Sequence, residues 1–302
     1  MNERQKFSRL VRFLPIFFLT FILIHFHRGF AQDSSLYKPE AILEFADHLY
    51  QESDYFRAIT EYERFLFMEP GYPYADTIRY RIGLCHQKRK RYALSNEIFE
   101  KLIHKYPSSD FLEAARYQIG LNYYFDDNYD NSIDHLLNNR SFIQSDFIVS
   151  KWHYLLGWNY LYRLQWGKAE TEFDTISRQF PARRWAAIAG QIREHAHQGY
   201  SLPARNPWLA GFLSTIIPGA GKMYADRFGD GLYSLIVIGT AGAVAFYSYQ
   251  HDYRSRAWGF GAFAVALHVG NIYGSIVQAK LYNIEKQEAL LQRIISNFEQ
   301  PR

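Results

Sequence analysis

The sequence predicts an all-α protein of two parts: a solenoid of helix–turn–helix units, then a transmembrane helical hairpin. Two observations support this fold class. Residues 43–181 repeat with a period of 37 positions, and two long uncharged apolar runs follow towards the end of the chain. A period in this range is typical of stacked supersecondary units that bury their apolar faces only against their neighbours.

The repeat is defined by columns of similar residues. In the second unit, small Gly83 is followed nine positions later by Tyr92, then by small Ser95 and by aromatic Phe99. Small residues surrounded by large ones allow two helices to cross closely. The first small column is Ala46, Gly83, Gly120 and Gly157, and the aromatic column is Tyr55, Tyr92, Tyr129 and Trp166.

Proline closes most of the units. Pro70, Pro107 and Pro181 end the first, second and fourth, whereas the third has Gln144 in that place. Because proline disfavours helix in the residue before it, each proline marks the end of a second helix.

This pattern resembles the tetratricopeptide repeat (TPR), in the lengthened form found in bacterial periplasmic proteins of envelope assembly and cell division. The columns above carry the resemblance, with the Tyr-Pro-Ser-Ser turn at 106–109 and Phe180-Pro181. The predicted solenoid covers residues 36–200, as four repeats and a capping helix. The first unit departs from the family in having alanine for glycine, and the third lacks its closing proline. The resemblance implies a concave surface for protein partners and no chemistry of its own.

By the family's geometry, the inward face of the first helices carries mainly aromatic side chains. The predicted partner-binding residues are Tyr80, Leu84, Tyr117, Leu121, Tyr124, Tyr154 and Trp158. Tyrosine and tryptophan are typical of binding hot spots, which favours a groove for a protein or peptide. The same spacing is also typical of a solenoid core, and the sequence leaves both interpretations open.

Composition excludes several functions. The 302 residues carry a net charge of +4, which is too small to indicate nucleic-acid binding. Cys85 is the single cysteine and is expected to pack in a helix. The basic run 88–91 is expected to be a solvated turn, with an anionic partner as the alternative. We expect no enzyme, cofactor or metal site, because no nucleophile–base set, metal cluster or phosphate-binding loop emerges.

Residues 1–31 are predicted to be a signal peptide. Lys6, Arg9 and Arg12 precede the apolar run 13–26, and the expected cleavage lies before Gln32. An uncleaved anchor is the alternative. In either case the repeats are exported, which predicts a location on the periplasmic side of a bacterial inner membrane.

A linker is predicted at 201–207 and a membrane domain at 208–282. The apolar segment 208–217 is too short to cross a bilayer, whereas 232–249 and 257–277 are long enough. The two spans are predicted to pack through small residues. These are Ala262, Ala266, Gly270 and Gly274 on one span and Gly239 and Ala243 on the other.

Polar features of the membrane domain have two interpretations. His268 and Asn271 share a helix face, either as hydrogen-bonding contacts between helices or as a functional polar site. The string Pro-Gly-Ala-Gly-Lys-Met-Tyr at 218–224 resembles the P-G-x-G-x-x-Y turn of a small bacterial two-helix membrane domain with an undefined role, and we expect a structural turn. Arg254 and Arg256 predict a cytoplasmic loop between the spans.

The last segment, 283–302, is predicted to be an amphipathic helix for a partner, the repeats or the membrane surface. The leading hypothesis is a membrane-tethered scaffold for protein–protein interaction in envelope or membrane-protein assembly. The alternative is a small transport or lipid-binding membrane domain regulated by the solenoid. The sequence specifies neither the partner nor the oligomeric state.

Overall fold

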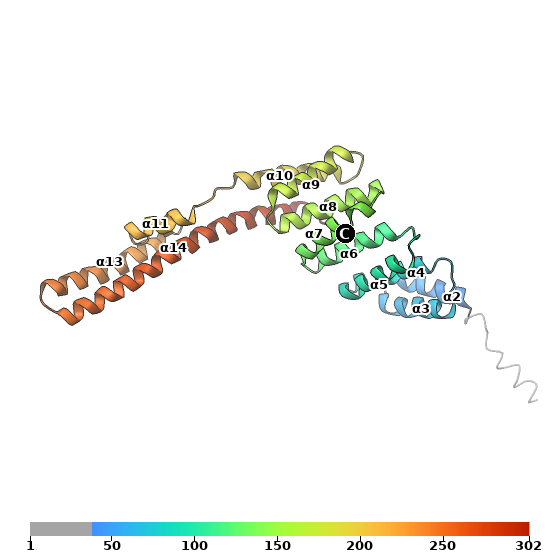
Figure 1. The fold of residues 1–302 in the computed structure, drawn as a ribbon, viewed down its shortest axis with the longest axis horizontal. Helices are drawn as coiled ribbons and strands as arrows, with labels where there is room; N and C mark the ends of the chain where they lie inside the picture. Colours follow the sequence, from blue (N-terminus) through green and yellow to red (C-terminus); the bar gives the residue numbers. More distant parts are fainter. Residues whose placement is uncertain (1–37, 302) are drawn as a thin grey trace, which may run out of the picture. The chain divides into compact units, whose positions relative to one another are not determined.

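The computed structural model describes residues 38–301, so the predicted signal peptide lies outside the described residues. Within that range every regular element is a helix (Figure 1), and the all-α solenoid is confirmed. The chain divides into two compact units, one up to Asn122 and one from Tyr123 on.

The first unit contains the first two repeats and most of the first helix of the third. Its helices are α2 (Pro39–Gln51), α3 (Tyr55–Met68), α4 (Ala75–Lys88), α5 (Tyr92–Lys105) and α6 (Leu112–Phe125), the last of which ends in the second unit.

The second unit completes the repeats and adds the hairpin. Its repeat helices are α7 (Tyr129–Asn139), η2 (Arg140–Phe142), α8 (Asp146–Tyr162), α9 (Trp166–Gln179), α10 (Ala186–Gln198) and η3 (Gly199–Ser201). Its hairpin helices are α11 (Pro207–Ile216), α12 (Ala220–Tyr224), α13 (Phe228–Gln250) and α14 (Arg254–Asn297).

The turn between the two helices of each repeat has one geometry throughout. The residue two positions before the second helix has a positive φ, close to +60°, in all four repeats. These residues are Ser53, Lys90, Asp127 and Leu164, again 37 positions apart. A non-glycine residue in this region costs about 1–2 kcal/mol, so the turn is imposed by the packing of the helices that it joins. The turn geometry therefore recurs with the same spacing as the sequence columns.

The small column lies where the two helices of a repeat cross. A Cβ atom on Gly83 would lie 2.5 Å from the Phe99 ring, and one on Gly157 would lie 2.7 Å from the Phe173 ring. Phe99 and Phe173 are fully buried. The aromatic ring of the second helix thus fills the space that a side chain on the first helix would need.

A buried polar link joins consecutive repeats, and the sequence analysis did not find it. Asn122 Nδ2 donates to Ser95 Oγ at 2.8 Å, and Ser95 Oγ donates to the Gly83 carbonyl at 2.8 Å. In the next repeat, Asn159 Nδ2 donates to Ser132 Oγ at 2.9 Å. Both asparagines are fully buried, so each link fixes the first helix of one repeat on the second helix of the repeat before it.

In the hairpin, α13 and α14 lie antiparallel and α11 packs along α14 (Figure 1). The contact between α11 and α14 uses Ala210 and Ser214 on α11 against Ala279 and Ser275 on α14. Gly211 also approaches α14 closely, because a Cβ there would lie 2.8 Å from the Ile276 side chain. Small residues at this interface allow close approach of the two backbones.

The predicted packing of the two spans through small residues is wrong. A Cβ atom on Gly239 or Gly270 would meet nothing within 4 Å, and both glycines are exposed. Helix α13 instead buries Ser234, Ile238 and Ala241. The reason is that α11 covers a neighbouring face of α14, and this contact fixes the rotation of α14.

The P-G-x-G string forms a tight junction, as expected for a structural turn. Gly219 has φ +87°, and a Cβ there would lie 1.9 Å from the Gly231 carbonyl oxygen. A Cβ on Gly221 would lie 1.8 Å from the Ala210 carbonyl oxygen. Glycine is required at both positions because backbone from α11 and α13 occupies the space.

The predicted linker is held against α14. The backbone N–H of Arg205 donates to Asn283 Oδ1 at 2.7 Å, and Asn283 Nδ2 donates back to the Arg205 carbonyl at 2.9 Å. Helix α14 runs unbroken over 44 residues and joins the predicted second span to the predicted tail helix. The hairpin is therefore continuous with the segment that follows it.

Candidate functional site

The predicted partner-binding residues fall into two groups. Those buried are Tyr117, Leu121, Tyr124, Tyr154 and Trp158. Tyr80 and Leu84, both on α4, are half-buried. Trp158 has no exposed surface and belongs to the core between α8 and α9. Partner binding by these residues stays a prediction.

In the first unit, Tyr80 is held in an aromatic stack. Its ring is stacked on Phe111 with the centroids 4.8 Å apart, and it lies 5.5 Å from the Phe99 ring. Burial raises the pKa of Tyr80, whose hydroxyl accepts a hydrogen bond from Gln118 Nε2 at 3.4 Å. Tyr80 keeps part of its surface exposed.

In the second unit, five aromatic side chains form what we call the aromatic cluster. They are Tyr124 of α6, Tyr129 of α7, and Tyr154, Trp158 and Tyr162 of α8. The rings of Tyr129 and Tyr162 are stacked with centroids 4.5 Å apart, and Tyr124 meets Tyr162 edge-on at 5.7 Å. Such pairs add to the stability that burial provides, so the rings are held in a fixed arrangement.

The segment after α14 lies on this cluster. The Tyr154 hydroxyl donates to the backbone carbonyl of Glu299. The hydroxyls of Tyr124 and Tyr162 both donate to Oε1 of Gln300, at 2.9 and 3.1 Å. Of the three destinations that the sequence analysis considered for the tail, this contact is with the repeats.

Burial raises the pKa of Tyr124, Tyr154 and Tyr162 above the ordinary value of tyrosine. All three phenols therefore stay protonated throughout the neutral range and remain hydrogen-bond donors. The site thus offers three converging O–H donors on an apolar aromatic floor.

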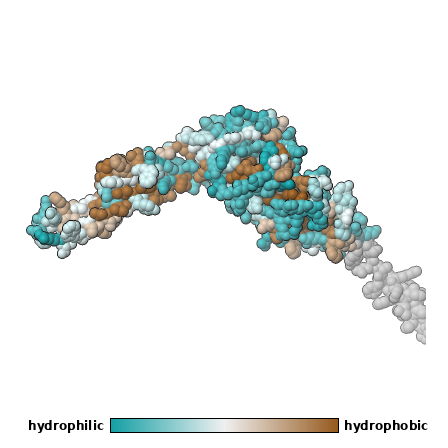
Figure 2. Space-filling view, viewed as in Figure 1, coloured by the Kyte–Doolittle hydropathy of each residue, from teal (hydrophilic) through white to brown (hydrophobic). Residues whose placement is uncertain are grey.

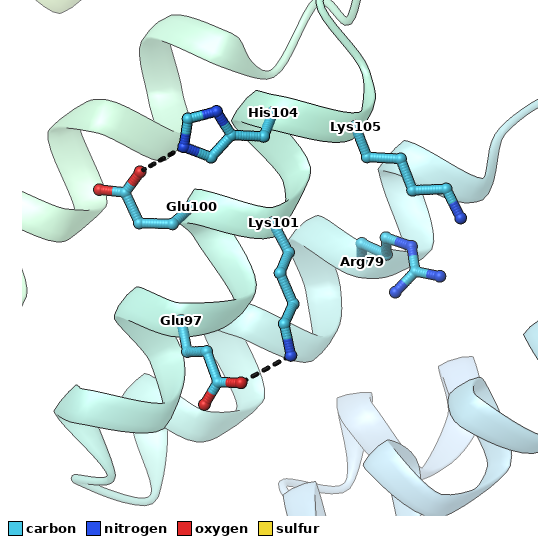
Figure 3. A pocket seen from close by; sticks show the side chains of 6 residues that line it. All are labelled: Arg79, Glu97, Glu100, Lys101, His104 and Lys105. Atoms are coloured by element: carbon cyan, nitrogen blue, oxygen red, sulfur yellow. Dashed lines mark hydrogen bonds and ion pairs between the residues drawn. The ribbon is translucent and has the colours of Figure 1, made fainter.

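A hollow of about 720 Å³ is lined by side chains of α4 and α5 (Figure 3). Its lining residues are Arg79, Glu97, Glu100, Lys101, His104 and Lys105. Lys101 pairs with Glu97 at 2.6 Å, and His104 lies 3.8 Å from Glu100. These charges are exposed and paired one helical turn apart, which is typical of a solvated face. In residues 38–301, no group of three or more His, Cys, Asp or Glu side chains could hold a metal ion.

The basic run 88–91 forms the end of α4 and the turn to α5, as expected. Lys88, Lys90 and Arg91 are exposed. The Arg89 guanidinium lies over the Phe56 ring, 5.0 Å from its centroid.

Of the two polar residues predicted inside the membrane domain, His268 contacts α11. His268 Nε2 lies 3.2 Å from the Thr215 carbonyl, to which it donates. Asn271 is buried, and its carbonyl accepts from Ser275 Oγ at 2.8 Å. The side-chain amide of Asn271 has no hydrogen-bond partner among the described residues. Both interpretations of this polar pair, hydrogen bonding between helices and a functional polar site, stay predictions.

Helices α13 and α14 are each long and apolar enough to cross a membrane. Large apolar side chains on them face outward, including Phe246, Trp258 and Val265 at 63, 79 and 64% exposure. Figure 2 shows apolar residues gathered over α11 and the adjoining part of the hairpin. A continuous exposed apolar surface of this kind indicates a partner, and a bilayer is compatible with it.

Residues 78–109 match the family model of the tetratricopeptide repeat. No curated protein matches the chain. The matched segment spans most of α4, all of α5 and the crossing of Gly83 with Phe99. The match and the helix pairs that recur every 37 residues together support a tetratricopeptide-repeat protein.

Proposed function

We propose that this protein is a membrane-tethered scaffold whose repeats hold a protein segment during envelope or membrane-protein assembly. The observation that carries the proposal is that one chain joins aromatic TPR surfaces to an apolar hairpin. Repeats of this kind bind proteins through such surfaces and carry out no chemistry. The hairpin would keep any bound segment close to the bilayer.

The dimensions of the hairpin support the tether. Helix α13 has 23 residues and is therefore about 34 Å long at 1.5 Å per residue. The hydrocarbon core of a bilayer is about 30 Å thick. Arg254 and Arg256 lie at one end of the hairpin, and the ion pair of Arg227 with Glu285 lies at the other. The apolar length between two charged ends fits one crossing by each helix.

The arginines give the proposed orientation. Short loops rich in arginine stay on the cytoplasmic side, so the loop at 251–253 with Arg254 and Arg256 faces the cytoplasm. Helix α14 then returns to the periplasmic side, where its last turns and the repeats are located. Single cysteines test this topology in a Cys85→Ser background. A cysteine at Ser255 is expected to resist a membrane-impermeant maleimide in intact cells, whereas one at Asp110 is labelled.

Partner binding is tested by photocrosslinking from accessible positions. A photoreactive residue replaces Tyr80 or Leu84 on the predicted inward face, and Lys101 on the solvated face is the matched control. The expected result is one protein captured from both inward positions and not from Lys101. Equal capture from all three positions, or none from the first two in cells that need the protein, would refute the scaffold.

A further inference from the structure

We infer that the aromatic cluster is a binding pocket for an extended peptide and that its resident occupant is the chain's own tail, residues 298–301. A partner segment of the same chemistry therefore has to displace this tail. The displacement deepens the proposed scaffold function and rests on it. Occupancy by the tail rests only on the contacts within the second unit.

The tail leaves the helix before it reaches the pocket. Helix α14 ends at Asn297, and Phe298 is extended with φ −128° and ψ 146°. Extended backbone exposes its carbonyl groups, and the Tyr154 hydroxyl binds the carbonyl of Glu299. This hydrogen bond is made to the main chain, so it favours an extended backbone and does not depend on the side chain at that position.

Selectivity comes from the next residue. Oε1 of Gln300 accepts two hydrogen bonds, from Tyr124 of α6 and from Tyr162 of α8. An amide oxygen has two lone pairs, and the two phenols use both. The two phenols come from the first helices of consecutive repeats. They can therefore bind one side-chain amide together only when both repeats are correctly stacked.

Residues on either side of Gln300 complete the contact. Pro301 is buried, and a proline leaves no backbone N–H to satisfy there. The ring of Phe298 lies edge-on to His195 of α10, with the centroids 5.4 Å apart. Glu299 lies 3.9 Å from Arg184, an exposed pair that contributes little to affinity. The pocket thus fits an aromatic residue, a spacer, a side-chain amide and a proline.

The contact is suited to release. The hydroxyls of Tyr124 and Tyr154 donate to the tail, and water can replace each of these hydrogen bonds when the tail leaves. The tail stays bound chiefly because its covalent link to α14 gives it a high local concentration at the pocket, on the order of 1 mM for a tethered segment. A partner present at a sufficient concentration can therefore displace the tail.

The test uses the full chain in detergent micelles and a fluorescent peptide with the sequence of residues 292–301, QRIISNFEQP. The wild type is compared with a tail variant, F298S/Q300S/P301S, whose helix content and thermal unfolding are checked first. We expect the tail variant to bind the peptide with a Kd of about 100 μM. The wild type is expected to bind about tenfold more weakly, because its own tail competes at about 1 mM.

Substitutions in the pocket identify the site of binding. In the tail variant, Tyr124→Phe with Tyr162→Phe removes both donors to the glutamine and is expected to weaken the peptide at least tenfold. Tyr160→Phe is the matched control, because Tyr160 lies on α8 but contacts Lys168 and not the tail. It is expected to leave peptide binding unchanged.

Three outcomes would overturn the inference. Equal affinity of wild type and tail variant would show that the tail does not occupy the pocket. A folded tail variant that binds no peptide would show that the pocket does not accept this segment. Competition that disappears on dilution of the wild type would assign the occupant to a second copy of the chain.

Failure of the tail contact and failure of the scaffold are distinguishable. Crosslinking from Tyr80 or Leu84 that captures a partner, together with equal peptide affinities, would refute only the tail contact. A tenfold ratio of affinities without any captured partner would refute only the scaffold.

Discussion

The buried asparagines give the most quantitative prediction, because each combines full burial with a defined set of partners. Asn159 Nδ2 donates to Ser132 Oγ at 2.9 Å and to the Leu155 carbonyl at 2.8 Å. In Asn159→Ala, both acceptors lose a donor in a place that water does not reach. An unsatisfied buried group costs about 1–3 kcal/mol. We therefore expect the free energy of unfolding to fall by about 2 kcal/mol.

Asn122 provides an internal comparison. Its Nδ2 donates to Ser95 Oγ and Asn96 Oδ1, and its Oδ1 accepts from Gln87 Nε2 at 2.8 Å. Asn122→Ala removes both functions of the amide, so we expect a loss of about 3 kcal/mol, larger than at Asn159.

The measurement is the thermal unfolding of the full chain followed by circular dichroism. A loss of 2 kcal/mol corresponds to a decrease in Tm of roughly 4–8 °C for a region of this size. Exposed Asn138→Ala is the control and is expected to change stability by less than about 0.5 kcal/mol.

A double-mutant cycle separates the hydrogen bond from the loss of side-chain volume. Ser132→Ala in the Asn159→Ala background removes a hydroxyl that no longer accepts a hydrogen bond from residue 159, so its added cost is expected to be smaller by about 1 kcal/mol than in the wild type. Additive losses, or a loss at Asn159 below 0.5 kcal/mol, would refute the reasoning.

Three further predictions concern the repeats. Gly83→Ala places a Cβ 2.5 Å from the Phe99 ring and is expected to cost about 1–3 kcal/mol of stability by urea unfolding, whereas Gly71→Ala in open space costs less than about 0.5. Leu164→Asn removes the backbone strain of a leucine at φ 54°, because asparagine tolerates this conformation better. The free energy of unfolding is expected to rise by about 1 kcal/mol and the Tm with it; an unchanged Tm would contradict this. Burial raises the pKa of the Cys85 thiol to about 12, so iodoacetamide at pH 8 should modify the thiol only after unfolding. Above about pH 8.5 only the thiol of the unfolded chain ionises, so the free energy of unfolding should fall as the pH rises. Rapid modification of the folded protein would exclude a buried thiol.

The solenoid was predictable because its information is local and repeated. Every unit buries the same columns against the next, so a pattern that is weak in one unit becomes clear over four. Asn122 and Asn159 stand 37 positions apart, but the same position in the second repeat is occupied by Cys85. Two asparagines and a cysteine share no chemistry that would define a column, so the asparagines were missed. Their role appears only when the facing Ser95 and Ser132 are seen at hydrogen-bond distance.

The packing within the hairpin was not predictable in the same way. Helix α14 has two faces rich in small residues, and hydropathy does not distinguish between them. The face of Ala266 and Gly270 was predicted to be buried against the other span, whereas the small face of α14 that is buried is that of Ser275 and Ala279, which packs on α11. The choice depends on α11, which corresponds to the segment 208–217 that is too short to cross a bilayer. Its length excluded a span but carried no information on the helix against which it packs.

The tail contact links the repeats of the second unit to the hairpin. A polar segment such as Glu299-Gln300 has no periodicity, so nothing in the sequence directs it to a particular surface. Its position follows from α14, which is fixed along its middle by α11 and by Asn283 on the Arg205 backbone. A change that rotates α14 at Ser275 would therefore also displace the tail from Tyr124 and Tyr162. If the tail competes with a partner, then partner binding at the repeats and the packing of the hairpin have to be coupled, because one helix carries both contacts.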